Sequence, residues 1–179
     1  MPHAQLITAD ELAEISTGKR CELIDGVVRD LPPAGYDHGR IAGNVFGLLW
    51  THVRRNELGA VCAAETGFVL RHDPDTVRAA DVSFVRADRA MESQPRFFPG
   101  TPDLVVEVVS PGDRAQDVDA KIKTWLGAGT IIAWVVWPQT RRMSVHRTGQ
   151  DVLTFSEHDT LDGGEVLPGF SCKVAEIFE

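Results

Sequence analysis

The chain has 179 residues, of which 43% are hydrophobic and 25% are charged, and its formal net charge is −8. The composition is that of a globular protein, which excludes a disordered chain and a coiled coil, and the length predicts one domain over residues 1–179. The basic residues are scattered singly or in pairs, which argues against a protein that binds nucleic acid mainly through its phosphates. An enzyme that reaches DNA through a bound metal is not excluded.

The chain shows no sign of export or of membrane insertion. No apolar run is long enough to span a membrane, and the first residues lack the charged and apolar regions of a signal peptide. Cys21, Cys62 and Cys172 are odd in number and far apart, so they form neither a disulfide framework nor a zinc motif. The sequence therefore predicts a reduced, cytoplasmic protein.

The first half of the chain predicts two helices and several strands. Thr8 and Glu11 have the spacing of a capping box, Asp25-Gly26 is a strong hairpin turn, and Asp37 is expected to cap the longer helix. The predicted elements are a helix at 8–16, a hairpin at 21–31, a helix at 38–56, and strands at 60–70 and 77–85.

The second half contains a strand–helix–strand unit. Its predicted elements are a loop at 88–102, a strand at 103–109, a helix at 114–127, a strand at 130–137, a hairpin at 141–147 and 151–156, and a short tail that ends near Phe178. The two strands of the unit are expected to be parallel neighbours. The predicted fold class is α/β (α+β), with a mixed β-sheet flanked by helices.

Two charged residues fall where the pattern predicts apolar surroundings. Glu107 lies in the middle of a strand that reads as buried on both faces. A carboxylate there is costly unless it is paired or bound to a cation. Lys121 falls between Val118 and Trp125 on the apolar stripe of the next helix. Two opposite charges misplaced on consecutive elements indicate an active site.

A third charged residue, Asp81, can join them. If the strand that carries Asp81 neighbours the strand of Glu107, and their faces coincide, the two carboxylates converge. Adjacent carboxylates repel each other unless a cation separates them. Mg²⁺ suits such a site because it takes oxygen ligands and keeps several waters. Lys121 would then orient a water or stabilise charge on a phosphate.

Simpler interpretations stay open for each of these residues. Glu107 and Lys121 could form a structural ion pair, which contributes little net stability because desolvation offsets the attraction. Asp81 alone would be an ordinary strand-end carboxylate, and His38 an ordinary residue at a helix terminus. Three other carboxylates are predicted to be surface charges: Asp103, Asp117 and Asp119.

An ordered set of short motifs resembles the Uma2 family, also called DUF820. The motifs are Glu-Leu-Ile-Asp-Gly at 22–26, His38 at a helix start, the segments 77–85 and 102–111, Lys121 four residues before Trp125, and Leu-Pro-Gly-Phe at 167–170. The resemblance runs over nearly the whole chain. Uma2 proteins are regarded as endonucleases of the PD-(D/E)XK superfamily, so the resemblance implies a restriction-endonuclease-like core.

The resemblance also implies roles for individual residues. Asp81 would be the first metal-binding acid and Glu107 the second, with the backbone carbonyl of Val108 as a further ligand. The lysine expected two residues after the second acid is absent, because position 109 is Val. Its function would be carried by Lys121 on the following helix.

Two more positions match, and three depart from the family pattern. Glu22 and His38 match positions thought to lie near the same site, although a hairpin glutamate by itself would be expected to be solvated. The departures are Ala80 where proline usually precedes the first acid, Cys21 where an aromatic residue often precedes the glutamate, and Trp137 where aspartate commonly precedes proline. None of them removes a proposed metal-binding or lysine position.

The sequence therefore predicts a Mg²⁺- or Mn²⁺-dependent endonuclease that acts on DNA. Two alternatives stay open: an inactive nuclease-like module for binding or assembly, and a metal hydrolase of another phosphoester. A homodimer is also expected, because exposed strand edges and surface tryptophans invite pairing.

Overall fold

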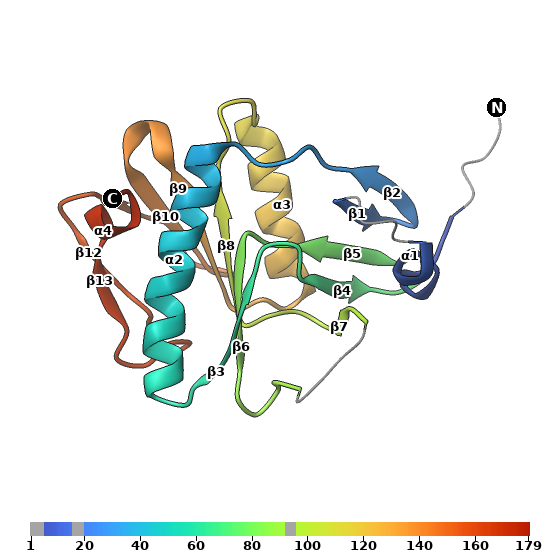
Figure 1. Ribbon diagram of the computed structural model, residues 1–179, viewed down its shortest axis with the longest axis horizontal. Coiled ribbons are helices and arrows are strands. Elements are labelled where there is room, and N and C mark those ends of the chain that lie inside the picture. The colour runs from blue at the N-terminus through green and yellow to red at the C-terminus, as the bar shows by residue number, and fades with distance from the viewer. Residues whose placement is uncertain (1–5, 16–19, 92–95) are drawn as a thin grey trace.

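The computed structural model describes residues 6–15, 20–91 and 96–179, which form two main sheets and four α-helices (Figure 1). The larger sheet has the strand order β11-β10-β9-β8-β6-β3. Its strands, in chain order, are β3 (Gly59–Ala63), β6 (Val82–Arg86), β8 (Leu104–Val108), β9 (Ile132–Trp137), β10 (Arg142–His146) and β11 (Leu153–Ser156). Only β8 and β9 are parallel among its pairs, as the strand–helix–strand unit predicted.

The smaller sheet has the strand order β2-β1-β5-β4-β7. Its strands are β1 (Cys21–Ile24), β2 (Val27–Asp30), β4 (Gly67–Arg71), β5 (Thr76–Ala79) and β7 (Phe98–Pro99). The hairpin of β1 and β2 turns at Asp25 and Gly26, which both have positive φ angles, 52° and 74°. Aspartate and glycine suit such a turn, so the predicted hairpin is confirmed.

Helices cover both faces of the larger sheet. The helices are α1 (Ala9–Ile15), α2 (Tyr36–Arg55), α3 (Ala115–Ala128) and α4 (Val174–Ile177), with a 3₁₀ turn at Pro138–Thr140. One core joins α2 and the C-terminal segment to one face of the larger sheet, and a second joins α3 to the other face and to the smaller sheet. In Figure 1, α3 accordingly lies between the two sheets.

The strand β8 divides its side chains between these cores. Val106 and Val108 pack in the core that contains α2, and Val105 packs in the core that contains α3. Because side chains alternate along a strand, Glu107 lies on the face toward α3. The residues of β8 are all buried, which confirms the predicted strand with a carboxylate in its middle.

The segment 77–85 is not the continuous strand that its alternation suggests. It comprises the end of β5, which pairs with β1 and β4, and the start of β6, which pairs with β3 and β8. The chain passes from one sheet to the other at Ala80 and Asp81, because β5 pairs only with strands of the smaller sheet and β6 only with strands of the larger sheet. Asp81 therefore lies at the junction of the two sheets.

Further expectations are wrong in detail. The predicted strand at 60–70 is divided between β3 in the larger sheet and β4 in the smaller sheet. The helix α2 begins at Tyr36 with Gly35 as its N-cap, so Asp37 lies in the first turn and makes no cap hydrogen bond. Its charge still faces the positive end of the helix dipole. The tail contains elements that the sequence pattern did not reveal: β12 (Thr160–Asp162), β13 (Ser171–Lys173) and α4.

Asp103 is buried, not a surface charge, and only 2% of it is exposed. Its carboxylate accepts hydrogen bonds from the Arg86 N–H at 2.9 Å and from Arg89 Nη1 at 2.8 Å. We expect Asp103→Ala to lower the free energy of unfolding by about 3 kcal/mol, because it removes the buried carboxylate that accepts hydrogen bonds from the Arg86 N–H and from Arg89.

Urea unfolding measures this loss. The control is Asp119→Ala, which removes an exposed carboxylate and is expected to change the free energy of unfolding by less than about 0.5 kcal/mol. Equal stability of the two variants would contradict a structural role for Asp103.

Candidate active site

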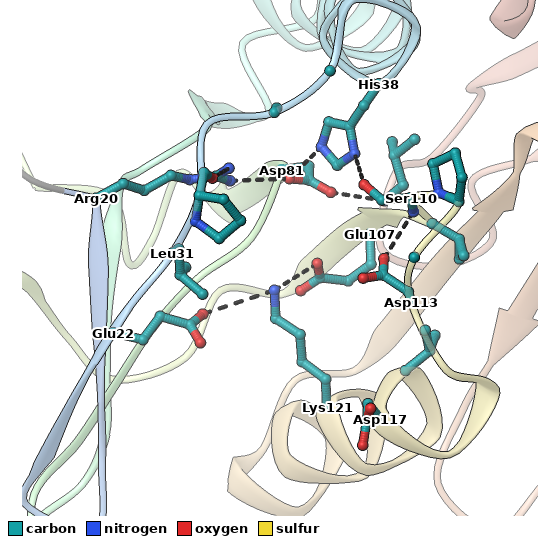
Figure 2. A pocket seen from close by; sticks show the side chains of 18 of the residues that line it. Arg20, Glu22, Leu31, His38, Asp81, Glu107, Ser110, Asp113, Asp117 and Lys121 are labelled. Carbon is teal, nitrogen blue, oxygen red and sulfur yellow. Dashed lines mark hydrogen bonds and ion pairs between the residues drawn. The ribbon is translucent and has the colours of Figure 1, made fainter.

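A pocket of about 720 Å³ opens between α3, the first hairpin and the start of α2. All six residues singled out from the sequence line it, and Figure 2 shows the charged side chains converging there. They are Glu22, His38, Asp81, Glu107, Val108 and Lys121. The structure thus brings together residues from β1, α2, β8, α3 and the junction between β5 and β6.

Asp81 is held from two sides although only 5% of it is exposed. Its Oδ2 accepts a hydrogen bond from the Val108 N–H at 2.7 Å, and its Oδ1 lies 2.9 Å from His38 Nε2. Burial acts to raise the pKa of Asp81, but the His38 and Val108 donors outweigh it and lower that pKa below its ordinary value. Asp81 is therefore a carboxylate at neutral pH.

Glu107 is bonded by two donors from α3. Lys121 Nζ lies 2.7 Å from Glu107 Oε2, and Trp125 Nε1 lies 2.8 Å from Oε1. Burial raises the pKa of Glu107 to about 7; the Lys121 charge opposes this rise and the Asp81 charge adds to it. Asp81 and Glu107 are therefore close enough to repel each other.

Lys121 links Glu107 to the first hairpin. Its ammonium lies 3.7 Å from Glu22 Oε1 and donates to the Ala79 carbonyl at 3.3 Å. Burial acts to lower the pKa of Lys121, but the charges of Glu107 and Glu22 raise it above its ordinary value. Lys121 is therefore an ammonium that bridges two carboxylates.

Glu22 is buried, not solvated as a hairpin glutamate is expected to be. Only 3% of it is exposed, because Arg78 and Ala79 of β5 and Lys121 of α3 surround its carboxylate. Glu22 accepts hydrogen bonds from Arg78 Nη1 at 3.0 Å and from the Ala79 N–H at 3.1 Å. The position that the sequence supported least is thus part of the charge network around Lys121.

His38 connects Asp81 to a serine that the sequence did not single out. It is the third residue of α2, and its Nδ1 lies 3.1 Å from Ser110 Oγ while its Nε2 faces Asp81. The hydrogen bond with Asp81 raises the pKa of His38. His38 therefore orients the Asp81 carboxylate and is more than a helix-terminus residue.

Sequence reasoning missed four polar groups of this site. Trp125, on the apolar stripe of its predicted helix, donates its indole N–H to Glu107, and Ser110, directly after the predicted strand 103–109, contacts His38. Arg20 and Arg78 line the pocket as well. The spacing held a signal for Arg20, because it precedes Glu22 by two residues, and alternate residues of a strand share a face.

Asp81 and Glu107 offer carboxylate oxygens, the ligand type that a hard divalent cation prefers. Within residues 6–15, 20–91 and 96–179, no three His, Cys, Asp or Glu side chains form a ligating group. The carboxylates of Asp81 and Glu107 are two acidic groups that a cation would meet in this pocket. That number suits Mg²⁺, which keeps several of its waters. A cation between Asp81 and Glu107 would also relieve the repulsion that contributes to the raised pKa of Glu107.

Comparisons with known proteins agree with this architecture. The Uma2 family model, described as "Putative restriction endonuclease", matches residues 9–175. The fold is similar to the crystal structure of "a putative nuclease belonging to DUF820" from Anabaena variabilis, with a TM-score of 0.81 and 20% sequence identity over 96% of this chain and 97% of that chain. This likeness confirms the predicted fold class. No curated protein matches the chain.

No helix in the described part of the chain is both long enough and apolar enough to cross a membrane.

Proposed function

The chain belongs to the Uma2 family, and from that premise we propose that it is a metal-dependent endonuclease that hydrolyses phosphodiester bonds in DNA. The observation that supports this most strongly is the meeting of Asp81, Glu107 and Lys121 in one open pocket. Two carboxylates and an ammonium at such close quarters are costly to bury for structure alone.

In this proposal Asp81, Glu107 and the Val108 carbonyl would hold Mg²⁺ or Mn²⁺. Bound there, the cation would supply Lewis-acid polarisation of a phosphate oxygen and a lowered pKa for water. Lys121 would position the attacking water and balance the negative charge that develops on the phosphate.

The surrounding side chains would hold Asp81 and Lys121 in position. His38 fixes the Asp81 carboxylate through Nε2. Glu22 draws the Lys121 ammonium toward the first hairpin, and Arg78 holds Glu22 in turn. We therefore propose that Glu22 and His38 position the reacting groups without contacting the phosphate.

A cleavage assay tests the proposed function. Supercoiled plasmid and labelled single- and double-stranded oligonucleotides are incubated with the protein in Mg²⁺, in Mn²⁺, or in EDTA. We expect cleavage in either cation and none in EDTA. Folded protein that cleaves no DNA in either cation would contradict an endonuclease.

The same assay separates the two alternatives. Five carboxylates line the pocket, against three side chains of arginine or lysine. This acidic balance argues against strong DNA binding, and it also argues against a function that uses no metal. Hydrolysis of bis(4-nitrophenyl) phosphate without cleavage of DNA would favour a hydrolase of another phosphoester. Inactivity on every substrate would favour a binding or assembly module.

The homodimer stays a prediction. Light scattering coupled to size-exclusion chromatography measures the mass in solution, and a mass near the 19.6 kDa of one chain would contradict it.

A further inference from the structure

Arg20 is a largely buried cation whose hydrogen-bonding capacity is hardly used. It immediately precedes β1, and its backbone is fixed by the hydrogen bond that its carbonyl accepts from the Leu31 N–H at 2.9 Å. The side chain is 23% exposed. Within residues 6–15, 20–91 and 96–179, its side chain makes one hydrogen bond, from Nη1 to the Pro32 carbonyl at 3.4 Å, and its buried Nε has no hydrogen-bond partner. A guanidinium has five N–H donors, so most of those of Arg20 have no partner in the described part of the chain.

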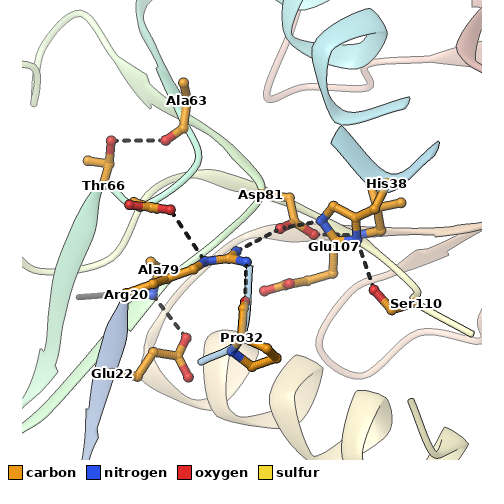
Figure 3. Close-up of polar contacts among 12 residues, drawn as sticks. Arg20, Glu22, Pro32, His38, Ala63, Thr66, Ala79, Asp81, Glu107 and Ser110 are labelled. Atoms are coloured by element: carbon orange, nitrogen blue, oxygen red, sulfur yellow. Dashed lines mark hydrogen bonds and ion pairs between the residues drawn. The ribbon is translucent and has the colours of Figure 1, made fainter. Parts of the chain in front are cut away.

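The ion pairs of Arg20 are also long. Its Nη2 lies 3.6 Å from Asp81 Oδ1, and its Nε lies 3.6 Å from Glu65 Oε1 (Figure 3). Both distances exceed the range of a hydrogen bond. Glu65 is itself 63% exposed, so it holds Arg20 weakly.

The buried carboxylates lie much closer to other cations than Asp81 lies to Arg20. The shortest ion-pair distances are 2.7 Å for Glu107–Lys121, 2.8 Å for Asp103–Arg89, 2.9 Å for Asp81–His38 and 3.0 Å for Glu22–Arg78. Arg78 also has a buried Nε without a partner, but its Nη1 is bonded to Glu22. Among the described cations that line the pocket, Arg20 is thus the one without a short hydrogen bond.

We propose that Arg20 binds a phosphate oxygen of the substrate, an inference that rests on the proposed function. The fork of a guanidinium matches a phosphate and can bind it through two parallel hydrogen bonds. Arg20 enters the pocket beside Asp81 from the hairpin side, whereas Lys121 enters from α3 (Figure 2). A phosphate near the two carboxylates would therefore meet a cation on each side.

The charge of the pocket makes this binding depend on metal. With five carboxylates against three arginine and lysine side chains, the pocket repels an anion until a divalent cation is bound. Binding of a phosphodiester is therefore expected only when a divalent cation is present.

Binding assays without cleavage test the role of Arg20. The anisotropy of a fluorescein-labelled oligonucleotide is measured in Ca²⁺, with a gel confirming that the DNA stays intact. Dimethyl phosphate binding is followed by ³¹P NMR. We expect Arg20→Gln to weaken both interactions at least about 10-fold, which is the worth of one charge-assisted hydrogen bond, and Arg20→Lys to weaken them less. The control Arg54→Gln removes an exposed cation from α2 and should bind as the wild type does.

Titration with Mn²⁺ separates phosphate binding from an effect through Asp81. Arg20→Gln is expected to bind Mn²⁺ at least as tightly as the wild type, because it removes a cation from beside the metal-binding acid. Loss of Mn²⁺ binding in Arg20→Gln would assign Arg20 to positioning Asp81 and overturn the inference.

The two assays also distinguish this inference from the proposed function. Wild-type affinity of Arg20→Gln for both probes would overturn the inference and leave the endonuclease intact. A wild-type protein that binds dimethyl phosphate but not DNA would contradict a DNA substrate. Loss of that dimethyl phosphate binding in Arg20→Gln would still support phosphate binding by Arg20. A wild type that binds neither probe in any divalent cation would overturn both.

Discussion

Asp81→Asn is expected to reduce DNA cleavage at least about 1,000-fold, equivalent to roughly 4 kcal/mol of transition-state stabilisation. The asparagine carbonyl can still accept the Val108 hydrogen bond that Asp81 Oδ2 accepts at 2.7 Å, so the junction between the sheets stays in place. What is lost is the negative charge that would hold the cation and pair with His38.

Calorimetric titration with Mn²⁺ and the plasmid assay measure this result together. The matched control is Asp117→Asn, which removes another carboxylate that lines the pocket but is exposed on α3. We expect it to keep both metal binding and cleavage. If Asp81→Asn binds Mn²⁺ as tightly as the wild type does, Asp81 is not a metal ligand.

The double variant Glu107→Gln/Lys121→Met is expected to abolish cleavage and yet to be more stable than the wild type at pH 8. Replacing both members of a buried ion pair with neutral groups removes their desolvation cost and leaves no charge unpaired. A structural pair and a catalytic pair therefore differ in activity, not in stability.

Because the pKa of Glu107 is raised, the stability difference between the double variant and the wild type is expected to depend on pH. Glu107 has a pKa of about 7 in the folded protein against an ordinary value of 4.5, so between these values the folded state binds more protons than the unfolded state. The free energy of unfolding of the metal-free wild type then falls as the pH rises through this window. The double variant lacks this titration, so its advantage should grow by on the order of 2 kcal/mol between pH 5 and pH 8.

Urea unfolding at pH 5 and pH 8 in EDTA checks the prediction. The matched control is Asp119→Asn/Lys123→Met, which neutralises an exposed ion pair on α3. Its charged atoms lie 2.7 Å apart, and the Asp119 and Lys123 side chains are 55% and 74% exposed. It should keep cleavage and show no growth in stability difference with pH. Full cleavage by the Glu107→Gln/Lys121→Met variant would favour the structural pair.

The sequence was informative wherever a residue type contradicts its local pattern. Glu107 in an apolar strand and Lys121 in an apolar helical stripe could be singled out because periodicity alone assigns each a buried face. Their contact at 2.7 Å follows from the strand–helix connection. The hairpin at Asp25-Gly26 was equally local, since two positive φ angles restrict the residues that form the turn.

What escaped prediction depends on packing between distant segments. Glu22 and Asp103 look like surface carboxylates in their own windows, and each is buried by elements far away in the chain. The break at Ala80 and Asp81 was hidden because β5 and β6 continue the same alternation while pairing in different sheets. Ser110 shows its relation to His38 only once β8 and α2 lie side by side.

The chain passes between the two sheets at Asp81, so the pocket residues on either side of it come from separate structural elements that can vary independently. The larger sheet and α3 supply Glu107, Val108 and Lys121, whereas the hairpin and its approach supply Arg20 and Glu22. If the proposed function holds, substitutions in the hairpin should change which phosphoester is bound while the proposed metal ligands keep their positions. Relatives should diverge in substrate preference through this hairpin, and exchanging it between two homologues should transfer that preference.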